Sequence, residues 1–426
     1  MIKTELNHDI YIGYSILIFF VLILLSIIGF KISNEAALLF FILSFNIFLI
    51  KDIYSQKSIF YSMTLIMVVH QIAVIYNVFF GTLPGARGDA IAFSDNAIFI
   101  MENDAFFLTY GSSLFQMIIA WVYKIFGQSY FMLSQLILLF FSYTCFKLLE
   151  ILHLLGVKEN KYIPLLFFGL LPSAVIHFSI PLREVFEVGF IMIYFNCLYK
   201  FVTFKKYKYL LLSIIPFIVI SLIHKAMLIL ALGILLMFIF IYIQEKMHKR
   251  WASLIFISIL SLFLVSLNLN SLFDYGIIDT VINFRESRDY GNTSYNVNLE
   301  NTVVGFIFGI IKIYYHYLFG PFIWDVSNIF DLTAAIESLI RLLVLYKILQ
   351  LYFKKKFTHE LHQNIKILLS LFLIITVFWS LGTSNYGTAV RHHLLDWWIL
   401  CIFIGYLYNN RTYKIRLILT RKNYDK

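Results

Sequence analysis

Residues 162–204 read YIPLLFFGLLPSAVIHFSIPLREVFEVGFIMIYFNCLYKFVTF, two apolar runs that meet at Arg183 and Glu184. Each run approaches the roughly 20 residues that a helix needs to cross the hydrocarbon core of a bilayer. Ionisable side chains are costly at membrane depth, so they persist where they are paired or functional. The stretch therefore predicts two membrane-spanning helices with a charged pair between them.

The rest of the 426-residue chain has the same character. Its mean hydropathy is +0.83, and 14% of its residues are charged, against about 25% in soluble proteins. The first apolar run, residues 11–30, lacks a small-residue cleavage site, so we interpret it as a retained span. We expect an all-α, polytopic membrane helical bundle that forms a single integral membrane domain over residues 1–426.

Clusters of lysine and arginine predict the topology, because basic loops remain on the cytoplasmic side of a membrane. They lie at residues 51–57, 158–161, 200–208, 246–250, 354–356 and 411–426. Their spacing predicts about twelve spans with both termini inside. The predicted spans are 11–30, 36–50, 59–80, 130–149, 162–179, 184–203, 208–224, 225–243, 252–268, 331–352, 364–381 and 393–408.

Two apolar stretches, 112–126 and 303–320, would place basic loops on the wrong side if they crossed the membrane fully. Polar residues interrupt both, so we expect helices that lie on the outer face or re-enter it. Long outer loops follow near residues 81–127, 269–331 and 382–393. Most polar groups fall on this side, so any chemistry should face the periplasm or the cell exterior.

Several classes of function are excluded by the same features. The net charge of +10 comes from short loops that encode topology, so we expect no nucleic-acid partner. Cys145, Cys197 and Cys401 lie inside apolar runs and form neither a metal motif nor a disulfide framework. His392 and His393 would point about 100° apart on a helix, which disfavours a shared metal ion. We expect no metal and no cofactor.

The first candidate group follows a glycine-rich turn and consists of Arg87 and Asp89. Glycine lets the backbone approach a ligand closely. A carboxylate just outside a span can take a proton from a sugar hydroxyl. Asp89 is therefore a candidate base and Arg87 a candidate substrate contact, and a solvated loop is the alternative for the acidic residues beyond them.

The second group is Arg183 with Glu184 and Glu187, which share a face if residues 184–203 are helical. Arginine holds a phosphate through two hydrogen bonds and keeps its charge. The alternative is an internal ion pair that fixes a helix end. The third group is His224 and Lys225, at the outer turn of a predicted hairpin. Histidine transfers protons near neutral pH, whereas a polar turn that reaches the membrane interface is the alternative.

Later segments add two groups and an aromatic turn. Arg391 and His392 suit an anion or a sugar hydroxyl. Arg285 and Arg288 lie in an outer loop that is either a lid over an acceptor or a solvated loop. The turn at residues 320–324, GPFIW, carries an aromatic ring that can stack on a sugar, although interfacial anchoring is the more common role of tryptophan there. Together the cations and carboxylates suit a substrate with phosphate and hydroxyl groups.

The order of these motifs resembles the repeat-unit polymerases of bacterial surface polysaccharide, of the Wzy and EpsG type that make O-antigen, lipopolysaccharide and exopolysaccharide chains. It is also broadly similar to the GT-C class of membrane glycosyltransferases. The resemblance rests on Gly88–Asp89, on Phe126-Gly127-Gln128-Ser129, on Arg183–Glu184 and on His224 after a lysine-rich inner loop. The chain departs from the pattern at Gly88–Asp89, which lacks the residue that separates the glycine from the aspartate in the family, and at Lys225, where a small or polar residue is usual. It departs also in a long loop whose arginines are reduced to Arg285 and Arg288.

The resemblance implies an enzyme that transfers a glycan from undecaprenyl diphosphate to another lipid-linked repeat unit at the outer face of the bacterial inner membrane. Arg183 and Arg391 would stabilise the diphosphate leaving group, and Asp89 or His224 would be the base. The implied substrate-binding residues are Arg87, Glu184, Glu187, Lys225, Arg285, Arg288 and His392. Membrane lipids and a chain-length regulator would be partners.

Two alternatives stay open. A GT-C-type transferase that uses a polyprenyl-phosphate sugar would have the same layout of site residues. A lipid-glycan flippase would show paired halves and charges at the bilayer midplane, whereas this chain has no internal repeat and its charges gather at one face.

Overall fold

The computed structural model describes residues 35–46, 56–246 and 302–424, except residues 85 and 108, and also residues 282, 285, 294, 295, 297 and 299. In these residues the secondary structure is helical, and the one β-type pairing is a bridge between Ser294 and Asn385. The predicted all-α class is confirmed. The predicted spans 11–30 and 252–268, and Arg288, lie outside the described residues.

Fourteen α-helices are described. They are α2 (Glu35–Asn46), α3 (Lys57–Ile75), α4 (Ile91–Glu102), α5 (Ser112–Phe126), α6 (Tyr130–Leu154), α7 (Tyr162–Leu170), α8 (Pro172–His177), α9 (Glu184–Phe204), α10 (Tyr207–Ile223), α11 (Lys225–Lys246), α15 (Val303–Phe319), α16 (Ile329–Phe353), α17 (His359–Gly382) and α18 (Tyr386–Tyr424). Short π-helical segments, Tyr76–Phe80 and Ala86–Ala90, flank the turn before α4, and a 3-10 turn spans Ile323–Asp325.

Five of the described helices are long and apolar enough to cross a membrane: Lys57–Phe80, Tyr130–Leu154, Glu184–Phe204, Ala226–Gln244 and His359–Gly382. They indicate a multi-pass membrane protein. The two stretches expected at the outer face are helices α5 and α15, of 15 and 17 residues. Both are shorter than the roughly 20 residues of a full crossing. The finer count of about twelve spans stays a prediction.

The predicted span 162–179 is two helices rather than one. α7 ends at Leu170, and Leu171 is extended (φ −56°, ψ 132°) before Pro172 opens α8. A residue that precedes proline is driven out of the helical region by the proline ring, and proline itself fits the first position of a helix. The predicted outer loop 81–127 is also largely helical, because it contains α4 and α5.

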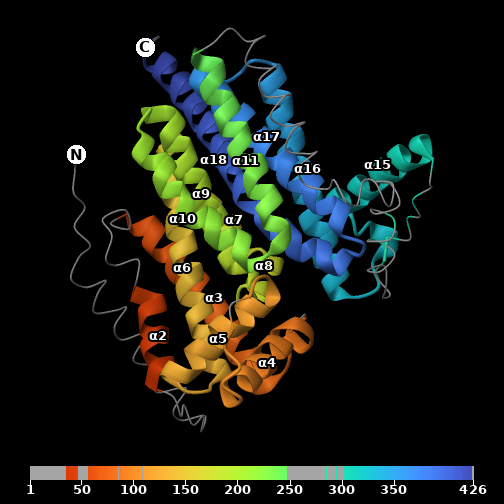
Figure 1. The fold of residues 1–426 in the computed structure, drawn as a ribbon. Coiled ribbons are helices and arrows are strands. Elements are labelled where there is room, and N and C mark those ends of the chain that lie inside the picture. Colours follow the sequence, from red (N-terminus) through yellow and green to blue (C-terminus); the bar gives the residue numbers. More distant parts are fainter. Residues whose placement is uncertain are drawn as a thin grey trace. The chain divides into compact units, whose positions relative to one another are not determined.

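The chain forms two compact units, residues 1–192 with 222–224 and 404–426, and residues 193–221 with 225–403. In the first unit α2 packs on α6, α4 packs beside α5, and α3 contacts α6, α7 and α8 (Figure 1). In the second unit α15 packs against α16 and α17, and α11 packs against α17. Helices α9, α10 and α18 contribute residues to both units.

Buried polar side chains link the helices of the first unit. Gln71 on α3 and Gln135 on α6 exchange two amide hydrogen bonds of 2.7 and 2.8 Å. His70 contacts Ser179 Oγ at 3.0 Å and the carbonyl oxygen of Gly169 at 2.9 Å. Such bonds hold helices together where the surroundings are as apolar as the side chains. The contact with Ser179 fixes the segment that leads into α9.

Candidate functional site

The start of α9 positions the central group of candidate residues. The carbonyl oxygen of Arg183 accepts the first helical hydrogen bonds, from the backbone N–H groups of Phe186 (3.0 Å) and Glu187 (3.1 Å). Glu184 and Glu187 therefore occupy the first turn, where the positive end of the helix dipole stabilises carboxylates. Both side chains are buried.

Glu187 lies between two groups that can carry positive charge. Its Oε1 atom is 3.3 Å from Nε of Arg183 and 3.2 Å from Nδ1 of His224. The Glu187 side chain is 2% exposed, whereas those of Arg183 and His224 are each 18% exposed. The carboxylate is thus covered, and the two nitrogen-bearing groups reach the edge of the protein. The structure brings together three predicted site residues, one of which is distant in sequence from the other two.

The contact of Glu187 with Arg183 is an ion pair, whereas the contact with His224 becomes one only when the imidazole is protonated. Neither pair of atoms has hydrogen-bond geometry toward the other. Contacts of this kind in a free enzyme commonly tighten when substrate binds. The Glu187 carboxylate can therefore stabilise a positive charge on either neighbouring group.

Aromatic packing holds this cluster in place. The ring of Phe186 lies 4.5 Å from that of Phe140 on α6 and 6.0 Å from that of Phe115 on α5. The backbone N–H of Gly111, just before α5, donates to the carbonyl oxygen of Leu222 at 2.7 Å. The start of α5 is therefore tied both to α9 and to the turn that carries His224.

Arg87 and Asp89 lie in the same unit, on the π-helical segment Ala86–Ala90 that leads into α4. Asp89 is exposed, and Gly88 interrupts the segment with a non-helical conformation (φ −86°, ψ −109°). Phe93 of α4 packs on Phe115 at 5.3 Å, which anchors this segment to α5. The catalytic and binding roles of Asp89 and Arg87 stay predictions.

The second unit holds the remaining described candidates. Nη1 of Arg285 donates to the carbonyl oxygens of Ser380 (3.3 Å), Leu381 (3.4 Å) and Thr383 (2.9 Å). These are the carbonyl groups at the end of α17, where a helix lacks internal partners and attracts cations. Arg285 thus caps α17 in addition to any substrate contact.

His392 contacts the same turn, because its Nδ1 atom lies 2.7 Å from Oγ1 of Thr383. Its ring lies 4.0 Å from the ring of Trp379. Arg391, the preceding residue on α18, is half-buried. Lys225 begins α11 in the second unit. Their roles in binding a phosphate or a sugar stay predictions.

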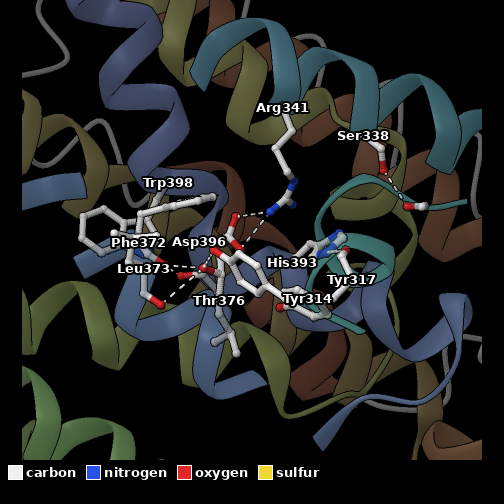
Figure 2. Close-up of polar contacts among 12 residues, drawn as sticks. Tyr314, Tyr317, Ser338, Arg341, Phe372, Leu373, Thr376, His393, Asp396 and Trp398 are labelled. Atoms are coloured by element: carbon white, nitrogen blue, oxygen red, sulfur yellow. Dashed lines mark hydrogen bonds and ion pairs between the residues drawn. The ribbon is translucent and has the colours of Figure 1, made fainter. Parts of the chain in front are cut away.

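One buried charged pair was missed from the sequence. Arg341 of α16 points at Asp396 of α18, and Nη1 donates to both carboxylate oxygens at 2.8 and 3.0 Å (Figure 2). Neither side chain is exposed. Close by, Nε2 of His393 contacts the carbonyl oxygen of Tyr317 at 2.7 Å. A charged residue inside the apolar run 331–352 was the signal that could have found this pair, because such residues mark functional or paired positions.

No group of three or more histidine, cysteine, aspartate or glutamate side chains could hold a metal ion in the part of the chain that the structure describes. The arrangement instead offers cations, a covered carboxylate and a histidine. Comparisons of the chain with protein-family models, with curated proteins and with solved structures give no significant match.

Proposed function

We propose that this protein is a membrane glycosyltransferase that joins undecaprenyl-diphosphate-linked oligosaccharides into a surface polysaccharide. The observation that supports the proposal is the covered Glu187 carboxylate between Arg183 and His224, at the start of a candidate membrane span. An anion-stabilising group and a proton acceptor thus adjoin one another. That pairing is what transfer from a lipid diphosphate to a hydroxyl requires.

In the proposed step, an acceptor hydroxyl oxygen bonds to the anomeric carbon of the donor glycan. The bond from that carbon to the diphosphate oxygen breaks, and the diphosphate leaves with the electron pair. Arg183 stabilises the charge on the leaving group. His224 takes the hydroxyl proton, and Glu187 stabilises the imidazolium that forms. The near-complete burial of Glu187 favours this positioning role over the direct substrate contact that the sequence suggested.

The proposal includes the predicted topology of about twelve spans, with both termini in the cytoplasm and the site at the outer face of the bacterial inner membrane. The lysine-rich turn between α9 and α10 lies at the opposite end of α9 from Arg183, which supports an outward position for the cluster. Asp89 is the alternative base. Arg391, Arg285, Lys225 and His392 belong to the second unit, and each remains a candidate contact for a phosphate or a sugar.

Replacing Arg183 with alanine tests the proposal. We expect the Arg183→Ala variant to remain in the membrane but to lose chain elongation, measured as the length distribution of extracted glycolipid. Lys147→Ala is a matched control, because Lys147 forms an ion pair with Glu150 in the same unit and its side chain is 16% exposed. Normal polymer length in Arg183→Ala cells would contradict the assignment.

A deletion strain separates the alternatives. Accumulation of a glycolipid with a single repeat unit supports the polymerase. Loss of one side-branch sugar supports a transferase that uses a polyprenyl-phosphate sugar. Movement of glycolipid across reconstituted vesicles without a new glycosidic bond supports a flippase.

A further inference from the structure

The second unit carries an exposed stack of aromatic rings beside a carboxylate. Trp324 lies on the 3-10 turn Ile323–Asp325 and is 79% exposed. Its ring stacks on that of Phe322 at 4.9 Å with an interplanar angle of 18°, and Phe322 stacks in turn on Tyr315 at 5.2 Å and 25°. Trp324, the last ring of this stack, therefore exposes a flat face at the surface of the protein.

Hydrogen bonds make the turn that carries Trp324 rigid. Oδ2 of Asp325 accepts from the backbone N–H of Phe322 at 3.2 Å and from the hydroxyl of Tyr386 at 2.9 Å. The Tyr386 oxygen also contacts Nδ1 of His316 at 2.8 Å. Ser338 of α16 donates to the carbonyl oxygen of Gly320 at 2.7 Å, which fixes the start of the turn. The platform is thus formed before any ligand arrives.

The neighbourhood of Trp324 is polar along one edge. The two hydrogen bonds described for the Asp325 side chain are both accepted by Oδ2. The other carboxylate oxygen, Oδ1, can therefore accept a hydrogen bond from a ligand hydroxyl. Ser327 and Asn328 follow, both exposed, and each donates a hydrogen bond to the half-buried carboxylate of Asp331. A pyranose ring has matching chemistry, with an apolar face of polarised C–H bonds and a rim of hydroxyl groups. The face of an aromatic ring is electron-rich and attracts such C–H groups.

We infer that Trp324 and Asp325 form a carbohydrate-binding subsite that holds a sugar of the glycan. Trp324 stacks on the apolar face of the sugar, and Oδ1 of Asp325 accepts from a hydroxyl. This inference rests on the proposed function for the identity of the glycan. Anchoring in the membrane interface needs only an amphipathic ring. It does not account for a tryptophan ring at the end of a three-ring stack, beside a hydrogen-bonded carboxylate.

The test compares Trp324→Leu with Trp324→Tyr in the full-length protein. Leucine keeps the apolar character that a membrane anchor needs but has no ring to stack, whereas tyrosine keeps a ring. The probe is the surface polysaccharide of the producing organism, added to detergent-solubilised protein and followed by calorimetry. We expect Trp324→Leu to bind roughly tenfold more weakly, and Trp324→Tyr to bind nearly as well as the wild type. Trp121→Leu, at another exposed tryptophan, is the control and should bind normally.

Equal binding by Trp324→Leu and the wild type, or no binding by the wild type, would overturn the subsite. A second measurement uses vesicles whose lipids have brominated acyl chains, which quench the fluorescence of a tryptophan that lies in the membrane. The subsite would also be overturned if the bromine quenched the Trp324 fluorescence and added polysaccharide did not restore it. The Arg183→Ala assay separates this inference from the proposed function. If the Arg183→Ala variant loses elongation while Trp324→Leu binds polysaccharide normally, only the subsite is contradicted. If the Arg183→Ala variant elongates normally while Trp324→Leu binds more weakly, only the transfer mechanism is contradicted.

Discussion

Replacing Arg341 with methionine should destabilise the second unit strongly. Arg341 and Asp396 are both fully buried, and Nη1 donates to each carboxylate oxygen, at 2.8 and 3.0 Å. The guanidinium carbon also lies 5.0 Å from the centre of the Trp397 ring. Methionine fills much of the same space but leaves Asp396 as a buried carboxylate without its cation.

The magnitude follows from the contacts that are lost. A hydrogen bond to a charged group contributes about 1.5–3 kcal/mol, and two are lost here. Removing one partner of a buried ion pair typically costs about 3–5 kcal/mol in total. A loss of that size lowers the folding equilibrium constant by roughly a hundredfold to a few thousandfold.

The measurement is unfolding of the purified protein in mixed micelles as the fraction of denaturing detergent rises. The double variant Arg341→Met/Asp396→Leu removes both charges, so it should recover most of the lost free energy of unfolding. Lys147→Met is the control, because its ion pair with Glu150 is partly exposed and such pairs contribute about 0–1 kcal/mol. The reasoning fails if the Arg341→Met variant is as stable as the wild type, or if the double variant is no more stable than the single one.

Two further predictions concern buried polar groups. The Gln71→Leu variant leaves the Gln135 amide without its partner and should lower the free energy of unfolding by about 1–2 kcal/mol. The double variant Gln71→Leu/Gln135→Leu should regain stability. A double variant that is less stable than the single one would count against a paired role. Burial, and then the charge of Lys312 on the same helix, lower the pKa of His316, so its neutral form is favoured in the folded state. As the pH falls below the ordinary pKa of about 6.5, the unfolded chain binds the proton more readily and stability should fall. His316→Asn, which does not titrate, should show a flatter dependence of the unfolding midpoint on pH, and an unchanged slope would refute this account.

The helices were largely predictable, because a span that faces lipid must be a continuous apolar run of a certain length. Residues 130–149 and 184–203 predicted α6 and α9 to within a few residues at each end. Pro172 could have predicted the break between α7 and α8, but residues 162–179 are apolar throughout and were therefore interpreted as one span. Helix α4 was missed because its polar residues made residues 91–102 look like part of a loop.

The candidate site was predictable only in part. The positions of charged residues at the ends of apolar runs identified Arg183, Glu187 and His224 as candidates. They did not reveal that one carboxylate oxygen of Glu187 lies within ion-pair distance of both Arg183 and His224. Arg285 was predicted to lie either in a lid over an acceptor or in a solvated loop. Its contacts with the carbonyl groups at the end of α17 depend on a chain reversal that residue spacing does not reveal.

By itself, the sequence determined that this protein is helical and crosses a membrane several times, because hydropathy and the length of apolar runs are local properties of the chain. Only the tertiary structure decided which charges meet. Arg341 and Asp396 lie on different helices, and their pairing depends on how α16 and α18 turn their side chains toward each other. The same holds for Glu187 and His224, since a buried charge is stabilised by the partner that packing places beside it, wherever that partner lies in the chain.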